Sequence, residues 1–221
     1  MNAPQFRSSA RFEVRSRLST HPWPHRLLRI TNGRRNPGGQ CFVDVNTTVL
    51  VDGFQGSGNS YTTQAIRAGT PGVTLAHHVH APAQVRAAAA LGVPVLLLLR
   101  QPHEAVASSV RRWPTLSPHV VLRGWLRYYR AVEPVIDDLV VGRFERVSTD
   151  LASVAQQVNE RFGTQLGVGH VAVMVDDPEE RKRRAGSRHH IADELARGSS
   201  ARTLREAQAL HQRLADHAAP A

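Results

Sequence analysis

Short apolar runs alternate with longer amphipathic stretches along most of this 221-residue chain. The clearest run covers residues 93–99, where Val, Pro and Leu follow one another without a polar residue until Arg100. An uninterrupted apolar run of this length is typical of a parallel strand that is buried on both faces. Residues 47–51, 73–76 and 140–147 predict three further strands, because each is short and enriched in β-branched or other apolar residues.

Helical periodicity fills the intervals between these runs. Proline or a capping residue at the start, and glycine at the end, mark several of the helix bounds. The predicted helices cover 58–68, 82–91 and 102–112, one that begins at Ser117-Pro118, one capped by Asp150, and 201–217. Strands that alternate with helices indicate an α/β fold with a central parallel sheet. In such sheets, ligands bind beyond the carboxyl ends of the strands.

Apolar residues in the helix that begins at Ser117 recur every three or four positions. They are Val121, Trp125, Tyr128, Val132 and Val135. A stripe with this spacing predicts core packing rather than a platform on which a base stacks.

The pattern of hydrophobic and polar residues is weaker in residues 1–40 and 176–188. Residues 1–40 carry eight arginines and little apolar pattern, which predicts a basic, partly disordered segment with an early strand at 27–30. Residues 176–188 are polar and basic and predict a loop. The remainder, 41–221, is expected to form a single domain, since a chain of this length suits one well-buried core.

Net charge indicates the class of ligand, and cysteine content indicates the cellular compartment. The chain has 28 Lys and Arg against 18 Asp and Glu, a formal net charge of +10, and this favours anionic ligands. Arginine dominates the basic residues, and its planar fork suits phosphate and sulfate esters. Cys41 is the single cysteine, so no internal disulfide can form, which fits a reducing cytoplasm. No apolar run in the sequence reaches membrane-spanning length.

The strongest chemical signal lies where the first predicted strand ends. Gly53, Gly58 and Ser60 have the P-loop spacing G-x-x-x-x-G-K-[ST], with Asn59 in place of the lysine. The glycines let backbone N–H groups turn toward an anion, and the helix N-terminus that follows adds positive potential. The segment therefore predicts a site for a phosphate or sulfate ester without the usual NTPase chemistry, with Ser57 and Ser60 as hydroxyl donors.

Two further polar segments follow predicted strands. Arg100 ends the long apolar run, and Ser108 lies about two turns into the next helix, so the two side chains are expected to grip a second phosphate. Three histidines, His77, His78 and His80, follow the second strand. Histidine suits the acceptance of a proton near neutral pH.

In these segments the chain resembles the PAPS-dependent sulfotransferases, which use 3′-phosphoadenosine 5′-phosphosulfate as donor. The family's first motif, roughly G-[FY]-P-[RK]-S-G-[NT]-[ST], is similar to residues 53–60. Its second motif, R-[DN]-P-x-[DE]-x-x-x-S, is similar to the segment that carries Arg100, Pro102, Glu104 and Ser108. The two motifs stand in the family's order, about fifty residues apart.

The resemblance covers roughly residues 45–190 and implies a P-loop NTPase-like, three-layer α/β sandwich with a central parallel sheet. It places the 5′-phosphosulfate on the first loop, and the 3′-phosphate on the second motif and on a C-terminal loop. The cofactor-binding residues that it implies are Gly53, Gln55, Gly56, Ser57, Gly58, Asn59, Ser60, Arg100, Ser108, Arg184 and Gly186. It also implies that a histidine deprotonates the acceptor hydroxyl: His78 by position, with His80 as the alternative.

At one position the loop departs from the family. Lys or Arg usually stands where this chain has Gly56, and it contacts the bridging oxygen of the leaving phosphate. Another cation must then neutralise the leaving group. Arg67, Arg111 and residues 181–188 are the candidates. No metal is expected, because sulfuryl transfer does not inherently require Mg²⁺ and the sequence has no Asp-rich signature.

The leading hypothesis is a sulfotransferase that acts on a hydroxyl acceptor, either a carbohydrate or a small metabolite. A nucleotide-binding protein of the same fold with little or no turnover would fit Gly56. A P-loop kinase would need the Walker lysine and an Asp that ends an apolar strand. A nucleic-acid binder is suggested by charge alone, and the aromatic content of 5% gives it little support.

Overall fold

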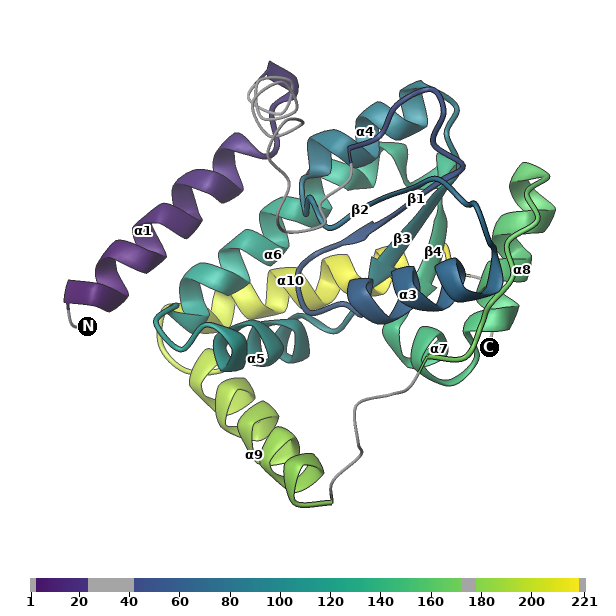
Figure 1. Cartoon of the computed structure of the whole chain (residues 1–221). Coiled ribbons are helices and arrows are strands. Elements are labelled where there is room, and N and C mark those ends of the chain that lie inside the picture. Colours follow the sequence, from purple (N-terminus) through teal and green to yellow (C-terminus); the bar gives the residue numbers. More distant parts are fainter. Residues whose placement is uncertain (1–2, 24–41, 172–177, 219–221) are drawn as a thin grey trace.

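A four-stranded, all-parallel sheet forms the centre of the protein, with strand order β2-β1-β3-β4 (Figure 1). The computed structural model describes residues 3–23, 42–171 and 178–218. The strands are β1 (Val49–Gly53), β2 (Leu75–His77), β3 (Val95–Leu99) and β4 (Val140–Arg143). In the central pair, Leu50 lies opposite Val95 and Gly53 lies opposite Leu98. This register brings the ends of β1 and β3 to the same edge of the sheet.

Helices pack on both faces of this sheet. They are α1 (Ala3–Leu18), α3 (Asn59–Gly69), α4 (Pro82–Ala90), α5 (Pro102–Arg112), α6 (Pro118–Val132), α7 (Phe144–Thr149), α8 (Leu151–Phe162), α9 (Pro178–Leu195) and α10 (Ser200–Ala215), with a 3-10 helix η1 (Glu133–Asp138). Side chains alternate along a strand, so Leu97 and Leu99 join the core under α4, α5, α6 and α10. Leu96 and Leu98 join the opposite core under α3 and α8.

The apolar pattern predicted this framework correctly. Every residue of β1 and β3 is buried, as expected for strands covered on both faces. The helix that begins after Ser117 buries most of its predicted stripe, and Asp150 caps α8 by accepting from the Ser153 N–H at 3.1 Å. The chain is therefore mixed α/β with a parallel sheet, in agreement with the sequence. Within the described parts of the chain, no helix combines the length and the apolar character needed to cross a membrane.

Two segments fold differently from the sequence prediction. The strand expected over 140–147 ends at Arg143, and the chain turns into α7. This turn packs Val147 against the sheet at Gly142. A Cβ on Gly142 would lie 3.0 Å from Val147 Cγ2, so the absence of a side chain at position 142 leaves space for Val147. The loop expected over 176–188 is largely helix α9.

The N-terminal segment contains a helix that the sequence pattern did not predict. This helix, α1, packs along α6. A Cβ on Gly124 would lie 2.7 Å from Phe12 Cε1, so this glycine lets the two helices approach closely. Glu13 accepts from Arg127 Nη2 at 2.8 Å and fixes the same contact. The early strand predicted at 27–30 lies outside the described residues.

Candidate functional site

The loop that joins β1 to α3 has the backbone geometry of an anion-binding turn. Gly56 and Gly58 have φ angles of 86° and 94°, in the left-handed region that glycine adopts without steric cost. A Cβ on Gly53 would lie 2.4 Å from the Leu98 carbonyl oxygen, so the pairing of β1 with β3 requires glycine there. Among the described residues no side chain caps α3, and its N-terminal N–H groups and positive dipole end meet this loop.

Side chains of the loop mostly maintain its shape. Ser57 is fully buried, with its Oγ 3.5 Å from Tyr129 Oη. The Asn59 side chain folds back and donates to the Phe54 carbonyl at 3.2 Å. Of the two hydroxyl groups that the sequence suggested as ligand donors, only Ser60 is exposed. The loop therefore offers an anion its backbone N–H groups and one hydroxyl.

A cavity of about 180 Å³, here called the arginine cavity, opens beside this loop at the end of β3. Its lining residues are Arg100, Glu104, Ala107, Ser108, Arg111, Phe144, Arg184, Ser187 and Arg188. The structure thus brings together Arg100, Ser108 and Arg184, which the resemblance to sulfotransferases assigned to one phosphate. Gly186 is not among the lining residues. Four arginines around so small a space favour a group with more than one negative charge.

Arg100 is held rigidly at the floor of the arginine cavity. Its Nη1 donates to the Gly56 carbonyl at 2.8 Å, and its Nε donates to Glu104 Oε2 at 3.0 Å. The guanidinium lies over the Phe144 ring, 3.8 Å from the ring centroid. Burial lowers the pKa of Arg100, and the hydrogen bond to Glu104 opposes that shift. Arg100 therefore connects the loop to the end of β3 and stays oriented.

Position 56 is tightly packed for the basic residue that sulfotransferases carry there. A Cβ on Gly56 would lie 3.1 Å from both the Ala105 carbonyl oxygen and Ser108 Cβ. The loop is thus pressed against α5, and positive charge comes from neighbouring elements instead. Arg111, one of the candidate cations, follows Ser108 by one turn of α5 and lines the arginine cavity.

The first two histidines form a chain of contacts with a fixed direction. His77 Nε2 lies 2.6 Å from Arg67 Nη2, and His77 Nδ1 lies 2.6 Å from His78 Nδ1. His78 Nε2 lies 3.0 Å from Ser60 Oγ. Arginine only donates, so His77 accepts at Nε2 and donates from Nδ1, and His78 in turn donates to Ser60. Arg67, a candidate cation for the leaving group, is therefore hydrogen-bonded to a histidine.

The imidazole rings of His77 and His78 are both neutral. Burial is the largest cause that lowers the pKa of His77, to about 4, and it also lowers the pKa of His78. The contacts occupy both nitrogens of His78 and leave it no free lone pair. Residue types and spacing alone gave no sign of this.

His80 has a different environment. Its Nδ1 lies 2.9 Å from the Gly53 carbonyl oxygen and 3.4 Å from Oδ1 of the buried Asp52. A carbonyl only accepts, so Nδ1 carries the proton and Nε2 keeps its lone pair. The backbone of His78 and His80 lies in the left-handed region, with φ angles of 60° and 52°, which is uncommon for residues other than glycine.

Sequence reasoning missed Asp52. It is fully buried, its Oδ1 accepts from the Gly53 N–H at 2.8 Å, and its Oδ2 has no partner among the described residues. A carboxylate inside an otherwise apolar strand was the available signal. Its position next to His80 resembles the orienting acid of a catalytic His–Asp pair.

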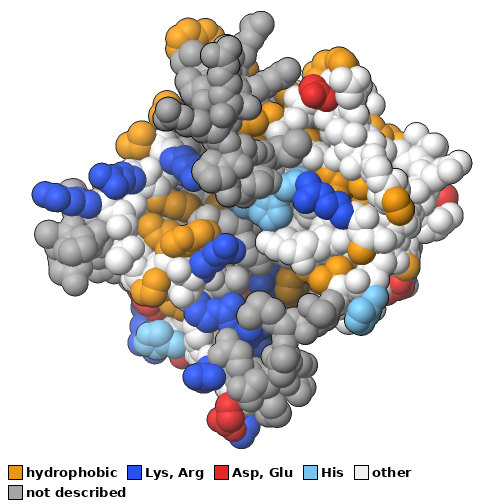
Figure 2. Space-filling view, in the orientation of Figure 1, with side chains coloured by type: hydrophobic (Ala, Val, Ile, Leu, Met, Phe, Trp, Pro, Cys, Tyr) orange, Lys and Arg blue, Asp and Glu red, His pale blue; other side chains and the backbone are white. Residues whose placement is uncertain are grey.

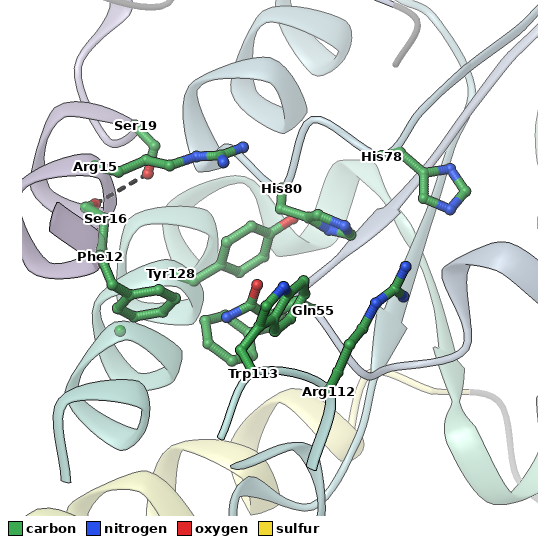
Figure 3. Close-up of a pocket in the computed structure, with 12 residues that line it drawn as sticks. Phe12, Arg15, Ser16, Ser19, Gln55, His78, His80, Arg112, Trp113 and Tyr128 are labelled. Carbon is green, nitrogen blue, oxygen red and sulfur yellow. Dashed lines mark hydrogen bonds between the residues drawn. The ribbon is translucent and has the colours of Figure 1, made fainter. Parts of the chain in front are cut away.

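A second cavity, of about 230 Å³ and here called the aromatic cavity, opens in front of these histidines (Figure 3). Its lining residues are Phe12, Arg15, Ser16, Ser19, Phe54, Gln55, His78, His80, Arg112, Trp113, Gly124 and Tyr128. Figure 3 shows Arg15 reaching in from α1 and Arg112 from the end of α5. Figure 2 shows basic side chains gathered around the histidines on this face. No feature of the sequence pattern predicted α1 at this site.

Comparison of the chain with protein-family models, with curated proteins and with solved structures finds no significant match. A functional assignment is therefore based on the residues of the two cavities.

Proposed function

We propose that the protein is a sulfotransferase with a P-loop NTPase-like fold, which transfers a sulfuryl group from 3′-phosphoadenosine 5′-phosphosulfate to a hydroxyl acceptor. The observation that carries this proposal is the position of the loop between two cavities. Gly56 contacts Arg100 and Ser108 of the arginine cavity, whereas Phe54 and Gln55 line the aromatic cavity. A donor with phosphate groups at both ends of its nucleoside, and a separate acceptor, require this two-sided arrangement.

The arginine cavity suits the 3′-phosphate of the donor. Arg100 and Arg184 supply charge-assisted hydrogen bonds, and Ser108 supplies a hydroxyl donor. The 5′-phosphosulfate then lies on the N-terminal turn of α3, where Ser60 and the backbone N–H groups face it. Arg111 lines the arginine cavity one turn of α5 after Ser108. In this proposal it takes the role of the basic residue missing at Gly56.

His80 acts as the general base in this proposal. Its Nε2 accepts the proton of the acceptor hydroxyl while the oxygen attacks sulfur in line. The bond between sulfur and the bridging oxygen breaks, and 3′,5′-adenosine bisphosphate leaves with the electron pair. Asp52 stabilises the imidazolium that forms. His78, the first choice from sequence, instead orients Ser60, because both of its ring nitrogens are engaged.

Nucleotide binding without turnover is a second candidate function. The closed packing around Gly56 favours it, since the loop lacks its own cation on the leaving oxygen. This candidate shares the donor site with the first and differs only in the transfer step. Release of 3′,5′-adenosine bisphosphate from the donor therefore separates the two.

Calorimetric titration with 3′,5′-adenosine bisphosphate, compared with ADP and with ATP plus Mg²⁺, tests the donor site. We expect the bisphosphate to bind most tightly, and Ser108→Ala and Arg184→Gln each to weaken it by about tenfold. Lys182→Gln is the matched control, because this exposed residue of α9 pairs with Glu179 and does not line the cavity. Preference for ATP with Mg²⁺ would overturn the proposal.

A further inference from the structure

We propose, building on the proposed function, that the aromatic cavity takes a small hydroxyaromatic acid as acceptor: one ring that carries a hydroxyl group and an anionic substituent. The proposed function supplies the role of the cavity as acceptor site. The ligand class is inferred from the walls of the cavity, its charge and its unpaired polar atoms.

Four aromatic side chains form part of the cavity walls: Phe12, Phe54, Trp113 and Tyr128. The Phe54 ring lies edge-on to Phe12 and to Tyr128, with centroid separations of 6.5 and 6.2 Å. Trp113 stands at the mouth and is 40% exposed. A space of about 230 Å³ between such faces suits a single ring with a short substituent.

The charge of the cavity favours an anion. Arg15 lines the cavity from α1 and Arg112 lines it from the end of α5. None of the described lining residues is acidic. Within the described parts of the chain, neither guanidinium pairs with a carboxylate, in contrast to Arg17 and Arg127, which both contact Glu13. Two arginines that pair with no described carboxylate attract a carboxylate to this cavity and repel an ammonium group.

Two buried polar atoms of the same cavity have no hydrogen-bond partner among the described residues: the Oη atom of Tyr128 and the Nε2 atom of Gln55. The Tyr128 side chain is buried, at 3% exposure. Burial raises the pKa of Tyr128 well above its ordinary value, so the hydroxyl stays protonated and donates. Buried donors without partners cost free energy, and a ligand oxygen relieves that cost.

Both residues line the same cavity as the proposed base. Tyr128 and Gln55 donate toward an oxygen, while His80 Nε2 accepts a proton, and all three residues line the one cavity (Figure 3). A phenolic hydroxyl satisfies both requirements, because its oxygen accepts and its hydrogen is donated. A carbohydrate would instead bring several hydroxyl groups against the rings of Phe12, Phe54 and Trp113, where those groups would lose hydrogen bonds to water.

A matched series of three phenols tests this class: 4-hydroxyphenylacetate, 4-(2-hydroxyethyl)phenol and tyramine. They share the ring and the phenolic hydroxyl and differ in carrying an anionic, a neutral or a cationic end. Affinities are measured by ligand-observed NMR on the full chain, with and without saturating 3′,5′-adenosine bisphosphate. We expect the acid to bind about tenfold more tightly than the neutral phenol, and tyramine to bind most weakly.

Arginine variants test which side chains cause the preference for the acid. Arg15→Gln and Arg112→Gln should each remove most of the preference for the acid and leave affinity for the neutral phenol unchanged. Arg11→Gln is the control, since it removes the same charge from the same helix one turn away and does not line the cavity. Equal binding of the three phenols, tighter binding of tyramine, or no binding of any of them would overturn the inference.

The failures of the two proposals are distinguishable. If the acid binds with the expected preference while the bisphosphate does not bind at all, the cavity assignment stands and the sulfotransferase proposal falls. If the bisphosphate binds tightly and the acid does not, the donor site stands and the acceptor class is wrong.

Discussion

Asp52 and His80 meet at the carboxyl end of the central strand, with 3.4 Å between the carboxylate Oδ1 and the imidazole Nδ1. The Gly53 carbonyl, 2.9 Å from the same nitrogen, fixes which tautomer the ring adopts. A buried carboxylate thus stands behind the nitrogen that keeps its proton, and the other nitrogen is left to react. In the proposed reaction, this pair is the proton acceptor.

Asp52→Asn is expected to lower kcat by about a hundredfold or more, because the imidazolium loses the charge that stabilises it. Affinity for 3′,5′-adenosine bisphosphate should stay within about twofold, since Asp52 does not line the arginine cavity. Turnover assays and calorimetry on the same preparations check both values. An unchanged kcat would exclude Asp52 from the transfer step.

Acid should destabilise the fold through His77. Its pKa is about 4 in the folded protein against 6.5 for the ordinary residue, so the unfolded state binds the extra proton first as the pH falls. The stability that this group contributes is present above about pH 6.5 and is lost on acidification toward about pH 4, with a slope approaching about 1.4 kcal/mol per pH unit.

Thermal unfolding measured between these pH values checks the slope. His77→Gln keeps a side chain that accepts from Arg67 and cannot titrate, so it should flatten the dependence on pH. An equally steep dependence in this variant would assign the effect to other groups.

Gly56→Lys restores the residue of the sulfotransferase motif and should nevertheless damage the protein. The new side chain needs a left-handed backbone and meets Ala105 and Ser108 at 3.1 Å, which costs about 1–3 kcal/mol. Gly56→Ala is the matched control, because it has the same backbone and contact problems without the charge. We expect similar losses of Tm in both. Faster turnover by Gly56→Lys at full stability would show that the loop accommodates a cation after all.

Phe144→Ala removes the ring beneath the Arg100 guanidinium. Loss of this cation–π contact should weaken bisphosphate binding by about tenfold, because Arg100 is then less well oriented. Binding of 4-hydroxyphenylacetate should be unaffected, since Phe144 does not line the aromatic cavity. Calorimetry with each ligand separates the two effects, and a parallel loss of both would indicate a global change in the fold.

Gly124→Val should displace α1 from α6, because a Cβ at this position would lie 2.7 Å from Phe12 Cε1. The aromatic cavity then loses Phe12 and Arg15, so binding of 4-hydroxyphenylacetate should fall by at least about tenfold. Bisphosphate binding should remain. The same titrations measure both affinities, and retention of the acid would show that α1 does not form part of the acceptor site.

The sequence was most informative where burial is two-sided. The apolar run that becomes β3 has one physical interpretation, and the rule that parallel strands end at one edge then places Arg100 near the loop. The segments that escaped prediction have few buried apolar residues. Helix α1 holds α6 largely through polar contacts such as Glu13 with Arg127, and α9 buries little beyond Ile191 and Leu195.

The sequence pattern could not show whether His78 or His80 is the proposed base, for a different reason. His78 and His80 have the same chemistry and lie two positions apart, but their partners come from distant parts of the chain. Arg67, through His77, and the Gly53 carbonyl decide which ring keeps a free lone pair, through contacts that only the folded chain assembles. Tautomer and function are set here by neighbours rather than by residue type.

Residues from the first twenty positions line the aromatic cavity but not the arginine cavity, so under the proposed function selectivity is modular. Exchanges confined to α1 would then change the acceptor that is recognised, while the proposed donor site keeps its residues. An evolving lineage, or a designer working from this chain, can thus diversify substrates by editing one peripheral helix.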